Sequence, residues 1–465
     1  MEENRYSYRK KGPLILMCLA LAITVIAGLA TAARPPEIQE EETVYAVREA
    51  QYPVTPQRPA SAETEEEKED YALWEADRAA RSELAAGCAE ALAPFSRRSA
   101  QLFLTAEEGK NQVYSPLSLY MTLSALSETT GGETRRQILD LLGAASIDSL
   151  REQAQAVWNA CCYDDGMARC VLSTSIWLDD GISFVPSTLD TLAGTYFASS
   201  FRGEMGSEAY DEILREWLAG QTGGYLRQET AGESFRDDTK AALMSVVSYR
   251  SAWVSAFSES DTRTGTFASP GGETSCLFLH QTLSGSYWRE DGFTAAFLPL
   301  DDGGKMWFLL PDEGVSPEEL TADGRALDFL LSASESEEDG AREGRGEGTA
   351  ASITFSVPKF DVGARISMED GLKRLGVVNA FSPELSNFAP LTDDAELYVG
   401  SVRQAVRVAV NEEGCSGASY TAVEMTDTGG ALPEEEFGMT LDRPFLFAVC
   451  TAEELPVFLG IVCEP

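Results

Sequence analysis

One histidine, His280, limits the chemistry that the side chains of this 465-residue chain could perform. A Ser-His-Asp or Cys-His enzyme would have to use it as the general base, yet its surroundings carry no nucleophile motif. A single histidine also makes a zinc site of the His/Cys type hard to build. Asp237-Asp238 and Asp301-Asp302 lack the spacing of a calcium loop. We therefore expect no catalytic residues, no metal and no cofactor.

Residues 412–426 have the pattern of a segment that can join a sheet. Glu412, Glu413 and Gly414 lead into a run of small residues. Side chains of a strand alternate between two faces. One alternate set is small or apolar throughout: Cys415, Gly417, Ser419, Thr421, Val423 and Met425. Glu424 and Tyr420 fall in the other set, and a shift of one residue would bury both. The segment is patterned like a strand with one buried face.

The cysteines carry no redox or zinc-ribbon spacing. Eight of the nine lie outside the N-terminal apolar segment, and none forms a CxxC pair. Cys161 or Cys162 with Cys170 is one local disulfide candidate, and a set of buried free thiols is the alternative. Cys415 lies in the loop, where we expect an exposed thiol that is open to oxidation.

Charge excludes two classes of partner. The chain holds 36 basic and 75 acidic residues, a formal net charge of −39. Such a chain repels nucleic acid and anionic membrane surfaces. The charge is typical of a soluble protein in an extracellular setting.

Composition divides the chain into four parts. Residues 1–12 are a basic n-region on the cytoplasmic side, and 13–33 are an uncharged apolar run. That run is either a signal peptide, with an A-x-A cleavage site at 30–32, or a retained membrane anchor. Residues 34–80 are acidic and rich in Pro and Glu, which predicts a disordered linker; a helix over 71–91 is the alternative for its second half. Residues 81–465 are one globular domain.

The domain mixes helices and strands. Phe95, Ser99, Leu102 and Phe103 share one helical face, and Ser115-Pro116 begins a helix that is apolar nearly all round, hence buried. Apolar runs predict strands at 171–178, 242–249, 297–300 and 306–310. The polar, Gly-rich stretch 332–351 predicts a loop insertion.

From residue 91 to the C-terminus the chain resembles the serpin family of protease inhibitors. The similar motifs follow in the family's order: 111–118, 131–134, Trp217-Leu218, Thr222-Gly223, Trp253 with Phe257 and Phe267, 309–311, 357–360, Leu375-Gly376, 442–447 and 458–460. The resemblance implies an α/β (α+β multi-sheet) fold with three β-sheets, about eight to nine helices and an exposed reactive-centre loop over about 412–440. It also implies a suicide inhibitor of proteases rather than an enzyme. We expect a monomeric, bacterial, exported member.

The resemblance also assigns roles to residues. The hinge of the loop would be Glu412, Glu413, Gly414, Cys415, Ser416, Gly417, Ala418 and Ser419. Ser115, Ser118, Ser245, Gln404 and Trp253 would form the sheet-opening cluster. Gln404 stands where the family has histidine and Ser245 where it has asparagine. Both side chains can donate and accept hydrogen bonds, so the cluster can still form.

Counting from the hinge places the reactive bond at Thr428–Gly429, with Met425, Val423 and Leu432 as alternatives. No Arg or Lys lies between 423 and 432. This favours an elastase-like or subtilisin-like serine protease as the partner over a trypsin-like one. The alternative function is a non-inhibitory serpin-fold binding protein that is cleaved as a substrate.

Overall fold

The computed structural model describes residues 45–59, 61–105, 107–332, 345–393, 397–400, 402–416 and 435–465. Val44–Pro465 forms one compact unit, and Met1–Thr43 is a separate unit that lies outside the described residues. The expectations for 1–12, 13–33 and 34–44 therefore stay predictions. No helix within the described ranges is long and apolar enough to cross a membrane.

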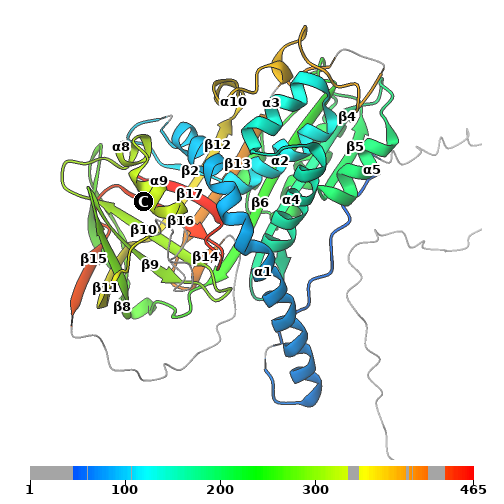
Figure 1. Ribbon diagram of the computed structural model, residues 1–465. Helices are drawn as coiled ribbons and strands as arrows, with labels where there is room; N and C mark the ends of the chain where they lie inside the picture. The colour runs from blue at the N-terminus through cyan, green and yellow to red at the C-terminus, as the bar shows by residue number, and fades with distance from the viewer. Residues whose placement is uncertain are drawn as a thin grey trace, which may run out of the picture. The chain divides into compact units, whose positions relative to one another are not determined.

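Two hydrogen-bonded sheets form the framework of the described residues (Figure 1). The first sheet has the order β1 (Ala46–Arg48), β5 (Ala198–Gly203), β4 (Arg169–Asp179), β6 (Ala241–Ala252), β14 (Gly414–Ser416), β13 (Val402–Val410), β12 (Phe360–Ser367), with β3 (Tyr163–Asp164) beside β4. The second has the order β15 (Glu436–Thr440), β11 (Thr349–Pro358), β8 (Gly272–Glu290), β9 (Phe293–Pro299), β10 (Lys305–Pro311), β16 (Phe445–Cys450), β17 (Pro456–Val462), β2 (Gln112–Tyr114), with β7 (Arg263–Ser269) beside β8. Two sheets are present rather than three because β8 is 19 residues long and pairs with β7, β9 and β11 along its length.

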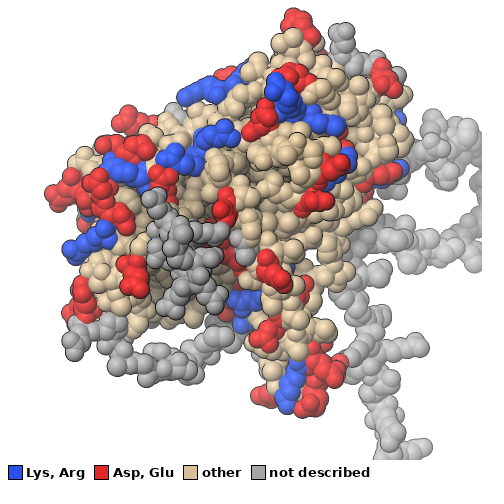
Figure 2. Space-filling view, in the orientation of Figure 1, with Lys and Arg blue, Asp and Glu red and all other residues tan. Residues whose placement is uncertain are grey.

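Ten α-helices occur among the described residues, somewhat more than the eight to nine expected. They are α1 (Glu65–Phe103), α2 (Pro116–Thr129), α3 (Gly132–Leu142), α4 (Ile147–Cys161), α5 (Pro186–Thr195), α6 (Glu208–Gln221), α7 (Arg227–Thr230), α8 (Pro317–Ala322), α9 (Arg325–Leu331) and α10 (Glu369–Arg374). In Figure 1, α1, α2 and α4 lie over one face of the first sheet. Figure 2 shows acidic and basic side chains interspersed on the same side of the molecule.

Helix α2 is the central element, as its composition predicts. Every one of its 14 residues is buried, which suits a helix that is apolar nearly all round. Ser115 caps it by accepting a hydrogen bond from the Ser118 amide at 3.3 Å. Pro116 occupies the first turn, where its missing N–H costs little. The cap places both serines directly beneath the first sheet.

The disordered linker expected over 34–80 is wrong where the structure describes it, and the alternative of a helix over 71–91 is confirmed, because α1 covers those residues. Strand β1 pairs with β5 and so covers an edge of the first sheet. Helix α1 begins at Glu65, because Thr64 and Glu67 form a capping box. Trp74 is only 4% exposed and donates from Nε1 to Asp165 Oδ2 at 2.8 Å. The average composition of 34–80 predicts disorder, because it does not reflect the few residues that hold this stretch on the domain.

We expect Trp74→Ala to lower the free energy of unfolding by about 3–5 kcal/mol, the usual cost of removing a buried aromatic side chain. Leu73→Ala is the matched control, because Leu73 is 63% exposed and its removal leaves no cavity. The comparison is made by denaturant titration. Equal midpoints for the Trp74 variant and the wild type would show that this part of α1 does not pack on the domain.

Candidate functional site

Strand β14 lies between β6 and β13, at one end of the first sheet. Gly414 and Cys415 stand opposite Ala252 and Ser251 of β6, and Cys415 also stands opposite Val410 of β13. The start of the hinge is therefore already a short strand of the sheet. This site is the entry to the gap between β6 and β13.

A turn over 411–413 brings the chain back from β13 into that gap. The Asn411 side chain accepts hydrogen bonds from the amides of Glu413 and Gly414, at 2.9 and 3.1 Å. Trp253 donates from Nε1 to the Asn411 carbonyl at 2.9 Å and from its amide to the Glu413 carbonyl at 3.0 Å. Trp253 thus binds the turn, eight residues along the chain from Ser245. Both of these hydrogen bonds go to the turn, whereas we had placed Trp253 in the sheet-opening cluster.

Glu412 anchors the turn to two residues that are distant in the sequence, Lys359 and Thr262. Lys359 Nζ donates to both carboxylate oxygens, at 3.0 and 2.8 Å, and Thr262 Oγ1 donates to one of them at 2.9 Å. Burial by itself would raise the pKa of Glu412, but these hydrogen bonds outweigh it and lower the pKa. The ionised carboxylate is therefore the form that holds the hinge in place.

This anchor predicts a pH-dependent contribution to stability. A lowered folded-state pKa gives a contribution that is complete above the unfolded Glu value, about 4.3, and is lost as the pH falls through the folded-state pKa. Lys359→Met removes the cation and should lower the free energy of unfolding by about 1–2 kcal/mol at pH 7. This value is modest because solvent screens the exposed part of the ion pair. Denaturant titrations from pH 7 to pH 3 measure the difference, which should shrink toward pH 3.

Lys110→Met is the control for that experiment. Lys110 pairs with Glu107 on the surface, where both side chains are more than 60% exposed, so its removal should change little at any pH. A difference between the Lys359 variant and the wild type that stays constant with pH would contradict the Glu412 anchor.

Gly414 is required by the close approach of the backbone of β6. A Cβ at this position would stand 2.3 Å from the Ser251 carbonyl oxygen and 2.8 Å from Ala252 Cα. Both are backbone atoms of a strand that is also paired with β4. Glycine is needed here for space, since Gly414 is not among the glycines with positive φ.

Cys415 faces the core, which corrects the expectation of an exposed thiol. It is 2% exposed, and its cross-strand neighbour Val410 is equally buried. Burial, and then the charge of Asp302, raise the pKa of the thiol, so it stays protonated and unreactive. The position agrees with the alternation that places Cys415 in the inward-facing set.

Strands β6 and β13 have β14 between them at one end of the sheet and pair directly with each other further along. Val402–Ala405 of β13 pair in parallel with Leu243–Val246 of β6. Strand β14 pairs with β13 at Ala409 and Val410. Among the described residues, the pairs that join β13 directly to β6 are the four at Val402–Ala405. We call the paired region Leu243–Val246 with Val402–Ala405 the seam; any further strand must part it.

The structure brings four of the five cluster residues together beneath the seam. Ser118 Oγ and Ser245 Oγ share a hydrogen bond of 2.8 Å. Gln404 accepts from the Ser115 amide at 3.0 Å and donates to the Ser115 carbonyl at 2.9 Å. All four are buried. Residues of β6 and β13 are thus tied to the start of α2, across both sides of the seam.

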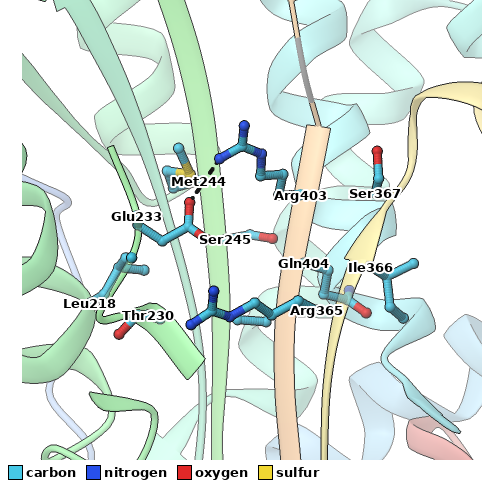
Figure 3. Close-up of a pocket in the computed structure, with 12 residues that line it drawn as sticks. Leu218, Thr230, Glu233, Met244, Ser245, Arg365, Ile366, Ser367, Arg403 and Gln404 are labelled. Atoms are coloured by element: carbon cyan, nitrogen blue, oxygen red, sulfur yellow. Dashed lines mark hydrogen bonds and ion pairs between the residues drawn. The ribbon is translucent and has the colours of Figure 1, made fainter. Parts of the chain in front are cut away.

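Three arginines on the opposite face were missed by sequence reasoning. Each reaches from β12 or β13 to the segment 225–233, which lies over β6. Arg407 donates to the Tyr225 carbonyl, Arg365 donates to the Gln228 carbonyl, and Arg403 pairs with Glu233, at 3.1, 3.0 and 3.1 Å. Figure 3 shows Arg365 and Arg403 pointing toward Thr230 and Glu233. The alternation of β13 predicts only that its arginines share one face; their partners depend on the tertiary fold.

Several expected site residues lie outside the described residues. They are Gly417, Ala418 and Ser419 of the hinge, and the reactive-bond candidates Val423, Met425, Thr428, Gly429 and Leu432. Their roles stay predictions. All eight cysteines from Cys88 onward are free thiols, which answers the question of a local disulfide. Within the described ranges no cluster of three or more His, Cys, Asp or Glu side chains could hold a metal ion.

A comparison with known protein families gives a match over most of the chain. A family model described as serpin (serine protease inhibitor) matches residues 90–465. The chain therefore belongs to the serpin family.

The relatives and the solved structures agree with that membership. Serpin-ZX of Arabidopsis thaliana is 25% identical over 378 residues, which cover 78% of this chain and 94% of the relative. Plasminogen activator inhibitor 1 of Mus musculus is 26% identical over 394 residues, covering 80% and 91%. The native-state crystal structure of the thermophilic serpin tengpin has a TM-score of 0.70 at 21% identity, covering 81% and 93%. Human thyroxine-binding globulin in complex with thyroxine has a TM-score of 0.68 at 17% identity, covering 82% and 99%.

Family membership supports protease inhibition in general. Relatives such as plasminogen activator inhibitor 1 are named as inhibitors, whereas thyroxine-binding globulin is named for a hormone. The matched relatives include plant and mammalian proteins, so they give no support to the bacterial origin that we expected.

Proposed function

We propose that this protein is a suicide inhibitor of serine proteases. The observation that carries the proposal is the strand Gly414–Ser416 between β6 and β13, with Cys415 facing the core. With Cys415 facing the core, a strand that continued from it would also turn the other small or apolar residues of its set toward the core. Cys415 is the first member of the inward set, and the rest of the set would follow it into the sheet.

The mechanism has two competing steps. The serine hydroxyl of the protease attacks the Thr428 carbonyl, the peptide bond to Gly429 breaks, and Thr428 becomes the acyl group of an acyl-enzyme. Water would release the protease by hydrolysing that ester. The freed segment after Ser416 instead enters the seam and gains backbone hydrogen bonds on both sides. The attached protease is carried along with it and distorted before hydrolysis.

The residues around the proposed bond select the class of protease. A trypsin-like enzyme needs a basic residue before the cut, and no Arg or Lys lies between 423 and 432. Thr428, or the alternatives Met425, Val423 and Leu432, suit the small or apolar specificity pockets of elastase-like and subtilisin-like enzymes. We further propose that the protein acts as a monomer outside the cell, secreted or anchored through 13–33.

The test is incubation of the compact unit Val44–Pro465 with an elastase-like and a subtilisin-like protease, followed by a denaturing gel. We expect a band at the summed mass that survives boiling in detergent. Mass spectrometry of the released C-terminal peptide places the cut. A clipped product beside a fully active protease would contradict inhibition.

That contrary result would favour a serpin-fold binding protein that is only cleaved. Gln404 and Ser245 replace the family's residues in the cluster, and the structurally similar thyroxine-binding globulin binds thyroxine. The gel separates the two functions, because a binding protein yields no covalent band.

A further inference from the structure

A cavity of about 310 Å³ lies directly on the seam, on the face of the first sheet away from α2. Ser245 points to Ser118 of α2, so its neighbour Met244 points to the opposite face. Met244 stands opposite Arg403 in the seam, and both line the cavity, as do Arg365 of β12 and Leu218 of α6 (Figure 3). The cavity is therefore bounded by both sides of the seam at once.

The lining combines an apolar base with a cationic rim. Leu218 and Met244 are buried, 3% and 6% exposed. Arg365 is exposed and donates a hydrogen bond to the Gln228 carbonyl. A guanidinium carries five N–H donors, so Arg365 keeps others for a ligand. Arg403 is 44% exposed and pairs with Glu233. Two arginines against one glutamate leave a net positive lining in a chain of charge −39.

We propose that this cavity binds a small amphipathic carboxylate, such as a medium-chain fatty acid. Its carboxylate would accept hydrogen bonds from Arg365 and Arg403, and its apolar body would cover Met244 and Leu218. Arginine suits a carboxylate because the fork of N–H groups matches two oxygens. Ligand pockets commonly enclose about 300–1,000 Å³, and this cavity lies at the lower end, which favours a small ligand.

The proposed site also couples to the proposed inhibition, and this second part rests on that function. A ligand here touches β6 on one side and β12 and β13 on the other. Entry of a further strand parts these elements, so the ligand binds the closed seam and is lost on insertion. A ligand that prefers one state stabilises it by its differential affinity. The carboxylate therefore slows insertion and shifts protease encounters toward simple cleavage.

Isothermal titration of the unit Val44–Pro465 with decanoate, below its micelle concentration, tests the site. We expect one saturable site, an affinity at least tenfold weaker for Arg365→Glu, and near wild-type affinity for Arg365→Lys. Arg236→Gln is the control, because Arg236 is an exposed arginine paired with Asp238 outside the cavity. Circular dichroism checks that each variant is folded. Absence of saturable binding, or equal affinity in Arg365→Glu, would overturn the site.

The same titration on protein with a cut loop tests the coupling. We expect affinity to fall at least tenfold after cleavage, while equal affinity before and after would overturn the link to insertion. Failure of this inference is distinguishable from failure of the proposed function. The covalent band is measured without fatty acid, and binding to the intact chain is measured without protease.

Discussion

Gly414→Val should convert the protein from an inhibitor into a substrate. The added side chain would begin 2.3 Å from the Ser251 carbonyl oxygen, a distance that no Cβ tolerates. The clash is with the backbone of β6, which is also paired with β4 up to Arg250, so we expect 414–416 to leave the gap. The yield of the covalent protease complex should fall at least tenfold, with the clipped product rising in its place.

Glu413→Ala is the control for this experiment. Glu413 lies in the same turn with an exposed side chain, and its contacts to Trp253 and Asn411 use backbone atoms. We expect an unchanged complex yield for the control. A wild-type yield from Gly414→Val would show that the start of the loop need not enter the sheet.

Gln404→Leu should lower the free energy of unfolding by about 1–3 kcal/mol. The leucine leaves the buried Ser115 amide without its partner, and an unsatisfied buried group costs about 1–3 kcal/mol. The Ser115 carbonyl keeps the hydrogen bond from the Leu119 amide at 3.3 Å. The leucine also cuts the tie between β13 and α2, so the seam should part more readily. Denaturant titration measures the free energy of unfolding. The rate of covalent complex formation shows how readily the seam between β6 and β13 opens, and we expect that rate to rise.

The matched control is Gln228→Leu, the same exchange at an exposed position, where we expect a small change. Gln404→His should recover part of the loss, since imidazole both donates and accepts. A Gln404→Leu variant as stable as the wild type would contradict the hydrogen bonds to Ser115.

Local patterns in the sequence predicted the elements of this site well. The apolar composition after Ser115 predicted a buried α2, and the apolar runs predicted β4, β6, β9 and β10. The alternation from Cys415 onward predicted the inward direction of that side chain. These features depend on residues a few positions apart in the chain, so they can be predicted from the sequence alone.

Other features depend on contacts between residues that are far apart in the sequence, which local patterns do not predict. The Cys415 thiol was expected to be exposed because 415 follows a loop-like run, yet β6 and β13 enclose it. Trp74 and the capping box at Thr64 order a stretch whose average composition predicts disorder. Trp253 was expected in the cluster with Ser245, but it directly follows the end of β6 and its indole and amide donate to the turn over 411–413. Arg365 and Arg403 meet their partners only through the tertiary fold.

Hydrogen exchange, followed by mass spectrometry before and after the loop is cut, tests the central claim most directly. We expect peptides from 417–425 to gain strong protection on cleavage, because they become a strand between β6 and β13. Peptides covering Leu243–Val246 and Val402–Ala405 should stay protected, since each strand exchanges its old partner for the new one. Unchanged exchange over 417–425 after cleavage would contradict insertion, and with it the trapping of the protease.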